Sequence, residues 1–447
     1  MFSVFKNAWK LPELRKKILF TLLMLLLYRL CCYIPTPGID PTIITNGIAS
    51  ANENIWGLMN IITGGSLQGY TFMAMGISPY INASIIIQLL QVVIPALERM
   101  AREENGREKI NKIVRYTSFG LAFLQAVGIC YAFNSQLQAS GSSMLVAGIN
   151  PVLAYVLIGL SLTAGTAVAM WIGDRISEKG LGNGISMLIF VGIIARFPVT
   201  VENYFATAAS NSALGNNALW WILPLVILAI VALIVVVIFV ELGERRISIQ
   251  YAKRVSGRKV YGGQSTYMPI KPNSCGVLPL IFSMSLLMFP SILTGMFWSG
   301  SKFEAFYTKW LGQGTWGYMI ASFLLTIGFA FFYSAISFNA AETSKNLQKY
   351  GGFIQGIRPG KPTTDYLNKV SKRLVLFSGL YLGVISSIPM LASAILSIIP
   401  NFDVNTVLGL ALTFSSTGLL IIVSVSIEIT KQLESQMVMR HYKGFLD

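Results

Sequence analysis

The sequence predicts an all-α polytopic membrane protein with about ten transmembrane helices. Hydrophobic residues make up 54% of the 447 residues and charged residues only 12%, about half the usual share for a soluble domain. A soluble chain of this length would need far more charge on its surface. The apolar residues also recur in blocks of roughly 20, the length of helix that crosses the hydrocarbon core of a bilayer.

The expected spans follow one another along the whole chain. They cover residues 18–36, 72–94, 114–134, 150–172, 184–203, 218–241, 274–298, 315–338, 374–397 and 404–428. The first span follows a basic segment, but Pro35-Thr36-Pro37-Gly38 comes after it without an Ala-x-Ala cleavage site, so we expect an uncut helix. The spans divide into two sets of five, over residues 1–203 and 204–447. Halves with an odd number of spans point in opposite directions, as in inverted-repeat transport folds, although no sequence repeat between them is visible.

Lysine and arginine are concentrated on one side of this topology. They gather in the N-terminal tail, in the loops after the even-numbered spans and in the C-terminal tail. The opposite loops hold only Arg196, Lys302 and Lys309. Because positive residues stay on the cytoplasmic side, we expect both ends of the chain in the cytoplasm.

Several function classes are disfavoured by what the spans contain. No GxxxxGK[ST] nucleotide loop occurs, and Cys31, Cys32, Cys130 and Cys275 form no CxxC pair, so we expect no cofactor and no metal site. A secondary transporter, the main alternative, usually carries ionisable residues at mid-membrane. Here the spans hold little beyond Arg29, Glu241 and Glu428, all near span ends. An intramembrane enzyme would need a nucleophile with a base, or paired acids, and neither is visible.

Two neighbouring segments break the pattern of simple spans. Residues 55–70 read IWGLMNIITGGSLQGY, which is too short to cross a bilayer and is interrupted by Gly64-Gly65. This segment is either an interfacial loop or a movable element seated in a cavity. The following span carries Asn82, Ser84 and Gln88, polar groups that should face protein or water. Ile81 and Ile85 share one face of that helix, as ordinary packing also requires.

Two long basic loops, about residues 241–271 and 339–373, contain patterns that predict secondary structure as well as a concentration of positive charge. In the first, Ile247, Ile249 and Tyr251 alternate with polar residues, and Ser256-Gly257 suits a turn, so a β-hairpin is predicted. The second contains GIRPG, residues 356–360, before a basic helical stretch. Both are either solvated loops or a docking surface for an acidic or RNA-rich partner.

Five motifs in order resemble the SecY family of protein-conducting channels. They are MGISPYINASIIIQLL, DRISEKGLGNGIS, the GERRI…YAKR…GRKVY…QSTYMPIK loop, GVLPLIF and GIRPG. Each motif alone is weak, but five in the right order are highly specific, and the resemblance covers nearly the whole chain. The resemblance implies an hourglass of two five-helix halves. Asn82 departs from this pattern, because a smaller serine is expected there.

The resemblance also implies which residues form the working parts. A ring of apolar side chains at the waist would comprise Ile81, Ile85, Ile185, Ile189, Ile281 and Ile421. A plug helix over residues 55–66 would seal the resting pore with Ile55, Leu58, Met59, Ile62, Gly64 and Gly65. A lateral gate between spans two and seven would include Ile86, Ser285 and Phe289. Partners would dock on Arg245, Arg246, Lys253, Arg254, Arg258, Lys259 and Arg358.

By this resemblance the chain would be a passive channel in the bacterial cytoplasmic membrane. It would pass unfolded secretory polypeptides across the bilayer and release hydrophobic segments sideways into lipid. The expected partners are the small membrane subunits SecE and SecG, the SecA motor ATPase and the ribosome. The ATPase or the ribosome would supply the energy. The chemistry is consistent, because stiff, branched isoleucine side chains make a narrow, dry constriction that bonds to no particular sequence.

Overall fold

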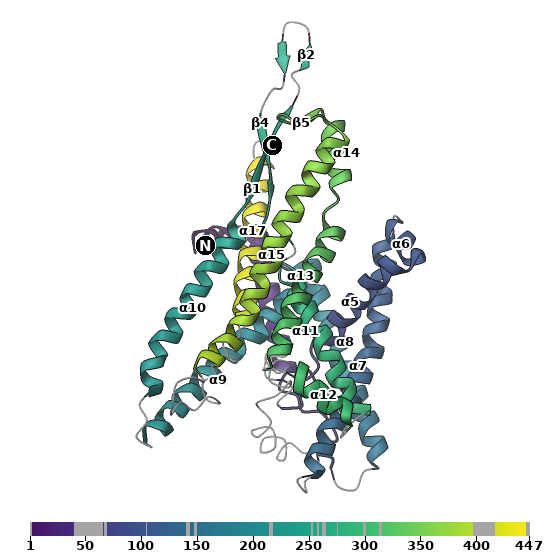
Figure 1. Ribbon diagram of the computed structural model, residues 1–447, viewed down its shortest axis with the longest axis vertical. Helices are drawn as coiled ribbons and strands as arrows, with labels where there is room; N and C mark the ends of the chain where they lie inside the picture. Colours follow the sequence, from purple (N-terminus) through teal and green to yellow (C-terminus); the bar gives the residue numbers. More distant parts are fainter. Residues whose placement is uncertain are drawn as a thin grey trace.

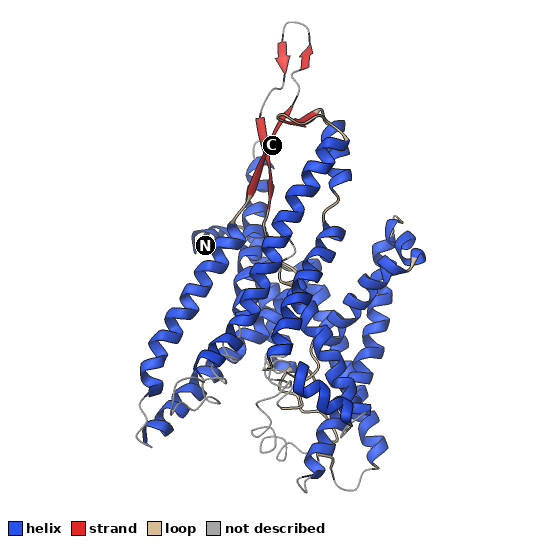
Figure 2. Ribbon diagram, in the orientation of Figure 1, coloured by secondary structure: helices blue, strands red, loops and turns tan. Residues whose placement is uncertain are grey.

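The computed structural model describes residues 2–39, 66, 69–103, 105–139, 144–146, 150–213, 218–251, 254–256, 259–261, 265–274, 276–297, 301–312, 315–396 and 416–443. Helices dominate this described part, and the strands gather at one end of the molecule (Figure 2). The long helices run side by side, with α10 at one flank and α7 at the other (Figure 1). The all-α fold class predicted from the sequence is confirmed.

Each predicted span overlaps one helix of the described chain, the last of them only from residue 416 onward, because residues 404–415 lie outside the described residues. In order these helices are α2 (Pro12–Cys31), α5 (Ser78–Val93), α7 (Gly106–Ala139), α8 (Pro151–Lys179), α9 (Gly184–Ala213), α10 (Ala218–Leu242), α11 (Leu278–Phe297), α13 (Trp316–Ser337), α15 (Lys361–Leu396) and α17 (Ser416–Lys443). By length and composition alone, four helices of the described part qualify as membrane spans, or five if one bent pair counts as a single span.

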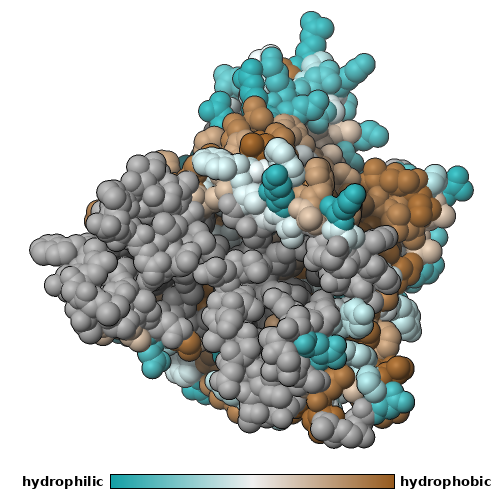
Figure 3. Space-filling view, turned by 60° about the horizontal axis from the view of Figure 1, so that its bottom comes forward, coloured by the Kyte–Doolittle hydropathy of each residue, from teal (hydrophilic) through white to brown (hydrophobic). Residues whose placement is uncertain are grey.

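Large apolar side chains cover the outer faces of these helices. On α10, Leu228 is 72% and Phe239 is 80% exposed. Figure 3 shows hydrophilic side chains gathered at the top of the view and apolar surface over part of the flank. Lipid tails are as apolar as leucine, so such faces are stable in a bilayer and costly in water. The exposed surface therefore agrees with the predicted membrane setting.

The second span differs from its predicted bounds. The helix α5 begins at Ser78 rather than near residue 72, and residues 72–77 form a series of turns. Gly76 has φ +51°, a conformation that favours glycine, and Pro79 lies in the first helical turn. At the other end the chain bends by 106° into α6 (Pro95–Arg102), because proline cannot continue the backbone ladder of the preceding helix.

The remaining helices and the strands connect the spans. The short helices are α1 (Phe2–Lys10), α12 (Lys302–Leu311) and α14 (Ala340–Lys349). The strands are β1 (Arg245–Tyr251), β2 (Arg254–Ser256), β3 (Lys259–Tyr261), β4 (Ser265–Ile270) and β5 (Gly352–Ile354). Antiparallel pairing of β1 with β4 and of β2 with β3 confirms the predicted hairpin. Ile247 and Ile249 are buried, as their alternation with polar residues predicted.

The structure adds a third strand to this hairpin. The sheet order is β4-β1-β5, and Ile249 of β1 lies opposite Ile354 of β5. Because β5 comes from the loop between α13 and α15, the two basic loops form one sheet. A buried cluster that includes Ile247, Ile270 and Ile354 packs this sheet against Leu367 of α15. The two loops are therefore one structural unit.

Candidate functional site

The six isoleucines of the predicted ring come from four helices, and the structure brings them together. Ile189 of α9 and Ile421 of α17 are buried in one apolar cluster, against which Ile81 of α5, Ile185 of α9 and Ile281 of α11 pack. Ile85 is 5% exposed and lies in an adjoining cluster, to which Ile81 also belongs. Side chains far apart in the sequence thus converge at one place between the helices.

The apolar cluster also contains residues that were not predicted from the sequence. Met73 and Ile77, from the turns before α5, are buried in the same cluster as Ile189 and Ile421. Met187 and Val425 join from α9 and α17. Methionine adapts its shape to irregular gaps. The apolar run TFMAMGI was visible in the sequence, but nearly all of it was assigned to the second span, residues 72–94.

The glycine-rich turn between α8 and α9 fixes the position of Ile185, the second residue of α9. The backbone nitrogen of Gly184 donates to Ser177 Oγ at 2.9 Å, and Ser177 Oγ donates to the Gly173 carbonyl at 3.0 Å. A Cβ atom on Gly184 would lie 1.9 Å from that carbonyl oxygen, so only glycine allows this approach. Asn183 Oδ1 then accepts from the nitrogen of Ile185 at 3.0 Å and caps α9. These glycines serve close packing of the two helices.

The same turn also ties together helices from both ends of the chain. The backbone nitrogen of Leu181 donates to Thr21 Oγ1 of α2 at 3.1 Å. The backbone nitrogen of Gly182 donates to Gln432 Oε1 of α17. Leu181 is buried in a cluster with Leu14 and Leu433 from the same two helices. This turn therefore fixes α9, and with it two isoleucines, relative to α2 and α17.

The sequence predicts a lateral gate between the second and seventh spans, which correspond to α5 and α11. Ile86 and Ser285 are partly buried, and the side chain of Phe289 lies outside the described residues. The buried contact consists instead of Ile85 of α5, Phe282 of α11 and Phe329 of α13. The third helix was missed because FAFFYS, residues 329–334, reads as an ordinary apolar stretch of a span.

The predicted plug falls outside the described residues. This holds for Ile55, Leu58, Met59, Ile62, Gly64 and Gly65. The segment stays a prediction of the resemblance.

The described basic residues of the two loops are divided among the three-stranded sheet, the separate two-stranded sheet β2-β3 and the turn after β5. Arg245 and Arg246 are exposed at the start of β1, and the guanidinium of Arg246 lies 5.0 Å from the ring centre of Tyr267. Arg358 is exposed in the turn between β5 and α15, and its carbonyl accepts from Thr363 Oγ1 at 2.8 Å. Arg254 lies on β2 and Lys259 on β3, while Lys253 and Arg258 lie outside the described residues. Pairing of β1 with β5 brings the loop that holds Arg358 to the base of the hairpin.

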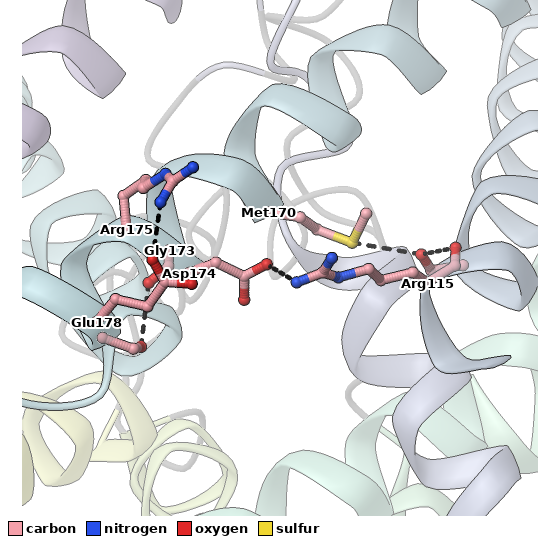
Figure 4. A network of polar contacts seen from close by, with 8 residues as sticks. Arg115, Met170, Gly173, Asp174, Arg175 and Glu178 are labelled. Atoms are coloured by element: carbon pink, nitrogen blue, oxygen red, sulfur yellow. Dashed lines mark hydrogen bonds and ion pairs between the residues drawn. The ribbon is translucent and has the colours of Figure 1, made fainter. Parts of the chain in front are cut away.

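A polar network braces α7 against α8 (Figure 4). Arg115 of α7 forms an ion pair with Asp174 of α8, and Arg175 pairs with Glu178 at 2.8 Å. Ser118 Oγ lies 3.3 Å from Met170 Sδ and 2.7 Å from the Arg115 carbonyl. The network links two helices of the predicted N-terminal half.

We expect the Arg115–Asp174 pair to contribute little to stability. The two side chains are 50% and 37% exposed, and solvent-screened pairs of this kind are worth at most about 1 kcal/mol. Arg115→Ala should therefore lower the thermal midpoint of the detergent-purified protein only slightly. Asp174→Arg should lower it more through like-charge repulsion, and adding Arg115→Asp should restore it. A large loss in Arg115→Ala would contradict this expectation.

Comparison with known proteins places these features in a family. A sequence model described as SecY matches residues 71–430. The protein translocase subunit SecY of Streptomyces coelicolor is 41% identical over 453 aligned residues, covering 100% of both chains. The subunit of the same name from Corynebacterium glutamicum is 40% identical over 457 residues, covering 99% of this chain and 100% of the relative.

Solved structures agree with this at the level of the fold. A solved structure of a protein conducting channel aligns with TM-score 0.66 and 19% identity, covering 97% of this chain and 96% of the other. Sec61 in the canine ribosome-channel complex from the endoplasmic reticulum aligns with TM-score 0.61 and 17% identity, with the same coverage. Together with the apolar helices, these relatives make this a multi-pass membrane protein. The chain belongs to the SecY family.

Proposed function

We propose that this chain is a protein-conducting channel of the bacterial cytoplasmic membrane, with both termini in the cytoplasm. It passes unfolded secretory polypeptides through a central constriction and releases hydrophobic segments sideways into lipid. The observation that carries the proposal is the convergence of Ile81, Ile185, Ile189, Ile281 and Ile421 in one apolar cluster from four helices. The membership of the chain in the SecY family supports the same activity.

The constriction seals the pore because it is narrow and excludes water, and not because it forms specific hydrogen bonds. Isoleucine is branched at Cβ and stiff, so a ring of such side chains holds a narrow opening that excludes water when it is empty. A ring that donates and accepts no hydrogen bonds has no preference for any passing sequence. It therefore suits a substrate whose sequence is arbitrary.

Release to the side follows from a second apolar cluster next to the ring, where α5 packs against α11 and α13. We call this contact the seam. Ile81 packs in the ring cluster and in the cluster between α5, α11 and α13. A sufficiently apolar segment in the ring partitions into lipid on the same energy scale that governs helix insertion. Parting α5 from α11 gives that segment a direct path.

The energy for transport comes from partners that dock on the cytoplasmic loops. The sheet β4-β1-β5 joins the two loops that carry the exposed Arg245, Arg246 and Arg358, and such a basic unit suits acidic or phosphate-rich partners. We assign this surface to the SecA motor ATPase and the ribosome. The canine Sec61 with the same fold is part of a ribosome-channel complex, which supports the second assignment. SecE and SecG are the small membrane subunits we expect beside the chain.

Site-specific cross-linking to a stalled secretory polypeptide tests the proposal. The four native cysteines are replaced, and single cysteines are introduced at Ile189 and Ile281. Matched controls on the same two helices are Ile194 and Leu286, which are each 43% exposed and belong to none of the buried clusters. We expect cross-links from Ile189 and Ile281 and none from Ile194 and Leu286.

Engagement of the stalled chain is checked independently by its protection from added protease. If an engaged chain cross-links to neither ring position, the pore assignment is wrong and a secondary transporter becomes the better hypothesis. Equal cross-linking at ring and control positions would show that the chain lies outside the proposed constriction.

A further inference from the structure

The short helix α12 presents large aromatic side chains at the molecular surface. Phe303, Phe306 and Trp310 are 53%, 58% and 58% exposed. The helix connects α11 to α13 and lies toward the end of the molecule opposite to the strands (Figure 1). We infer that α12 is an interfacial anchor, whose aromatic face inserts into the outer leaflet of the bilayer at the boundary between lipid headgroups and acyl chains. This inference goes beyond the proposed function and rests on it only for the level of the ring in the bilayer.

The sequence of α12 has an apolar side and a polar side. At 3.6 residues per turn, the apolar side comprises Phe303, Phe306, Tyr307, Trp310 and Leu311. The polar side carries Lys302, Thr308 and Lys309, all exposed. Tyr307, at one edge of the apolar side, is only 5% exposed. The protein therefore covers one edge of the apolar side and leaves the three aromatic residues next to it uncovered.

Contacts at both ends fix the direction of this aromatic face. The hydroxyl of Tyr307 donates to the carbonyl of Leu287 in α11. At the start of α13, Thr315 Oγ1 lies 3.0 Å from the carbonyl oxygen of Trp310. A Cβ atom on Gly317 would lie 2.0 Å from that same oxygen, so α13 and the end of α12 approach closely. The helix is thus fastened to α11 and to α13.

The same contacts define the level of α12 along the two long helices. Ser283 of α11 donates through Oγ to the carbonyl of Ser322 in α13 at 3.0 Å, so these two residues lie at one level. Leu287 is four residues from Ser283, and Gly317 is five residues from Ser322 in the same direction. At 1.5 Å per residue, these distances are about 6 Å and about 7.5 Å. Because the two levels agree, α12 lies across α11 and α13, close to parallel with the bilayer plane.

This level corresponds to the edge of the hydrocarbon core. Leu287 is six residues beyond the ring residue Ile281, about 9 Å along α11. The hydrocarbon core is about 30 Å thick, so a ring at its middle lies about 15 Å from the outer edge. The helix α12 then lies about 6 Å inside that edge, within the depth at which amphipathic helices bury their apolar faces. Tryptophan is also enriched at this boundary.

The surroundings of α12 suit lipid as its partner. On α13, Trp316, Ile320 and Leu324 follow at intervals of four residues and are 57%, 55% and 61% exposed, so a stripe of apolar surface continues from α12 toward the bilayer centre. The exposed Lys302 and Lys309 have long stems that reach from this level to lipid phosphates. Among the described residues of α12, none belongs to the cluster of the seam. The anchor is therefore separate from the path of side release.

Quenching of a fluorescent label by lipids tests the anchor. In the full-length chain the four native cysteines are replaced, and a single cysteine at Phe306 is labelled with nitrobenzoxadiazole. The protein is reconstituted in vesicles of phosphatidylethanolamine and phosphatidylglycerol. These vesicles also contain phosphatidylcholine with a nitroxide either close to the headgroup or near the end of the acyl chain. We expect the label to lose most of its fluorescence to the nitroxide close to the headgroup, and little to iodide present on both sides of the membrane.

Two further labelled positions calibrate this result. Thr308→Cys is the matched control, because it is exposed and lies two residues from Phe306, on nearly the opposite side of the same helix. Its label should be quenched by iodide and little by either lipid. Leu324→Cys on α13 lies near the level of the ring, so its label should be quenched mainly by the deep nitroxide. If the Phe306→Cys protein fails to fold, Trp310→Cys carries the same expectation.

The possible outcomes separate the anchor from its alternatives. Iodide quenching at Phe306 equal to that at Thr308 overturns the anchor, because the aromatic face then lies in water. Protection of the Phe306 label from both nitroxide lipids and from iodide also overturns it, because a protein partner then covers the face. Failure of the proposed function has a different signature. In that case the label at Leu324 escapes the deep nitroxide, which removes the ring from the middle of the bilayer.

Discussion

Replacing Gly184 with alanine is expected to destabilise the protein by more than about 3 kcal/mol, the upper range for overpacked sites. The added Cβ would lie 1.9 Å from the carbonyl oxygen of Gly173. This neighbour is backbone within α8, so it cannot turn away as a flexible side chain would. The first turn of α9 has to move away from α8, and Ile185 moves with it. The measurement is the thermal midpoint of the purified protein in detergent.

Gly328→Ala is the matched control for this prediction. Gly328 lies inside α13, and an added Cβ there meets no atom within 4 Å. Alanine in a helix interior is favoured over glycine by roughly 0.5–1 kcal/mol, so this variant should be equally or more stable. A Gly184→Ala protein as stable as Gly328→Ala would show that α8 and α9 do not approach as closely as described.

Reversing the charge of Arg358 is the second change with a large expected effect. Arg358→Glu is expected to abolish ATPase-driven transport while the channel still inserts into the membrane. Truncating one partner of a buried interfacial charge pair typically costs about 2–5 kcal/mol, and reversing the charge adds repulsion. The carbonyl of Arg358, rather than its guanidinium, accepts the bond from Thr363, so the exchange preserves that contact. The turn should therefore keep its shape.

The measurement is ATP-dependent transport into vesicles with purified motor ATPase, alongside the amount of channel in the membrane. Lys349→Glu is the control, because it makes the same change in charge at an exposed position at the end of α14. Normal transport by Arg358→Glu would show that the assignment of Arg358 to partner docking is wrong. Equal loss in both variants would indicate a general effect of loop charge rather than a specific contact.

The site could be predicted from the sequence only in part, and the reasons differ by residue. Ile81, Ile189 and Ile421 were selected through motifs, and their convergence required the packing of separate helices. Phe329 and Tyr333 were not selected, because they belong to no motif and lie in a helix whose few polar side chains do not mark the lipid face: Ser322, Thr326 and Ser334 are buried. In such a helix the sequence has no amphipathic pattern that distinguishes the buried face from the lipid face.

By itself, the sequence determined the helical membrane fold class, the basic hairpin and the family. These follow from runs of hydropathy, alternation along a strand and motif order, which are properties of consecutive residues. Only the tertiary structure decided that β5 joins the hairpin, that α5 begins at Ser78 and that Gly184 abuts Gly173. Those features depend on which backbones approach each other across the fold. Between apolar helices that choice is made by shape and close packing, which no run of consecutive residues encodes.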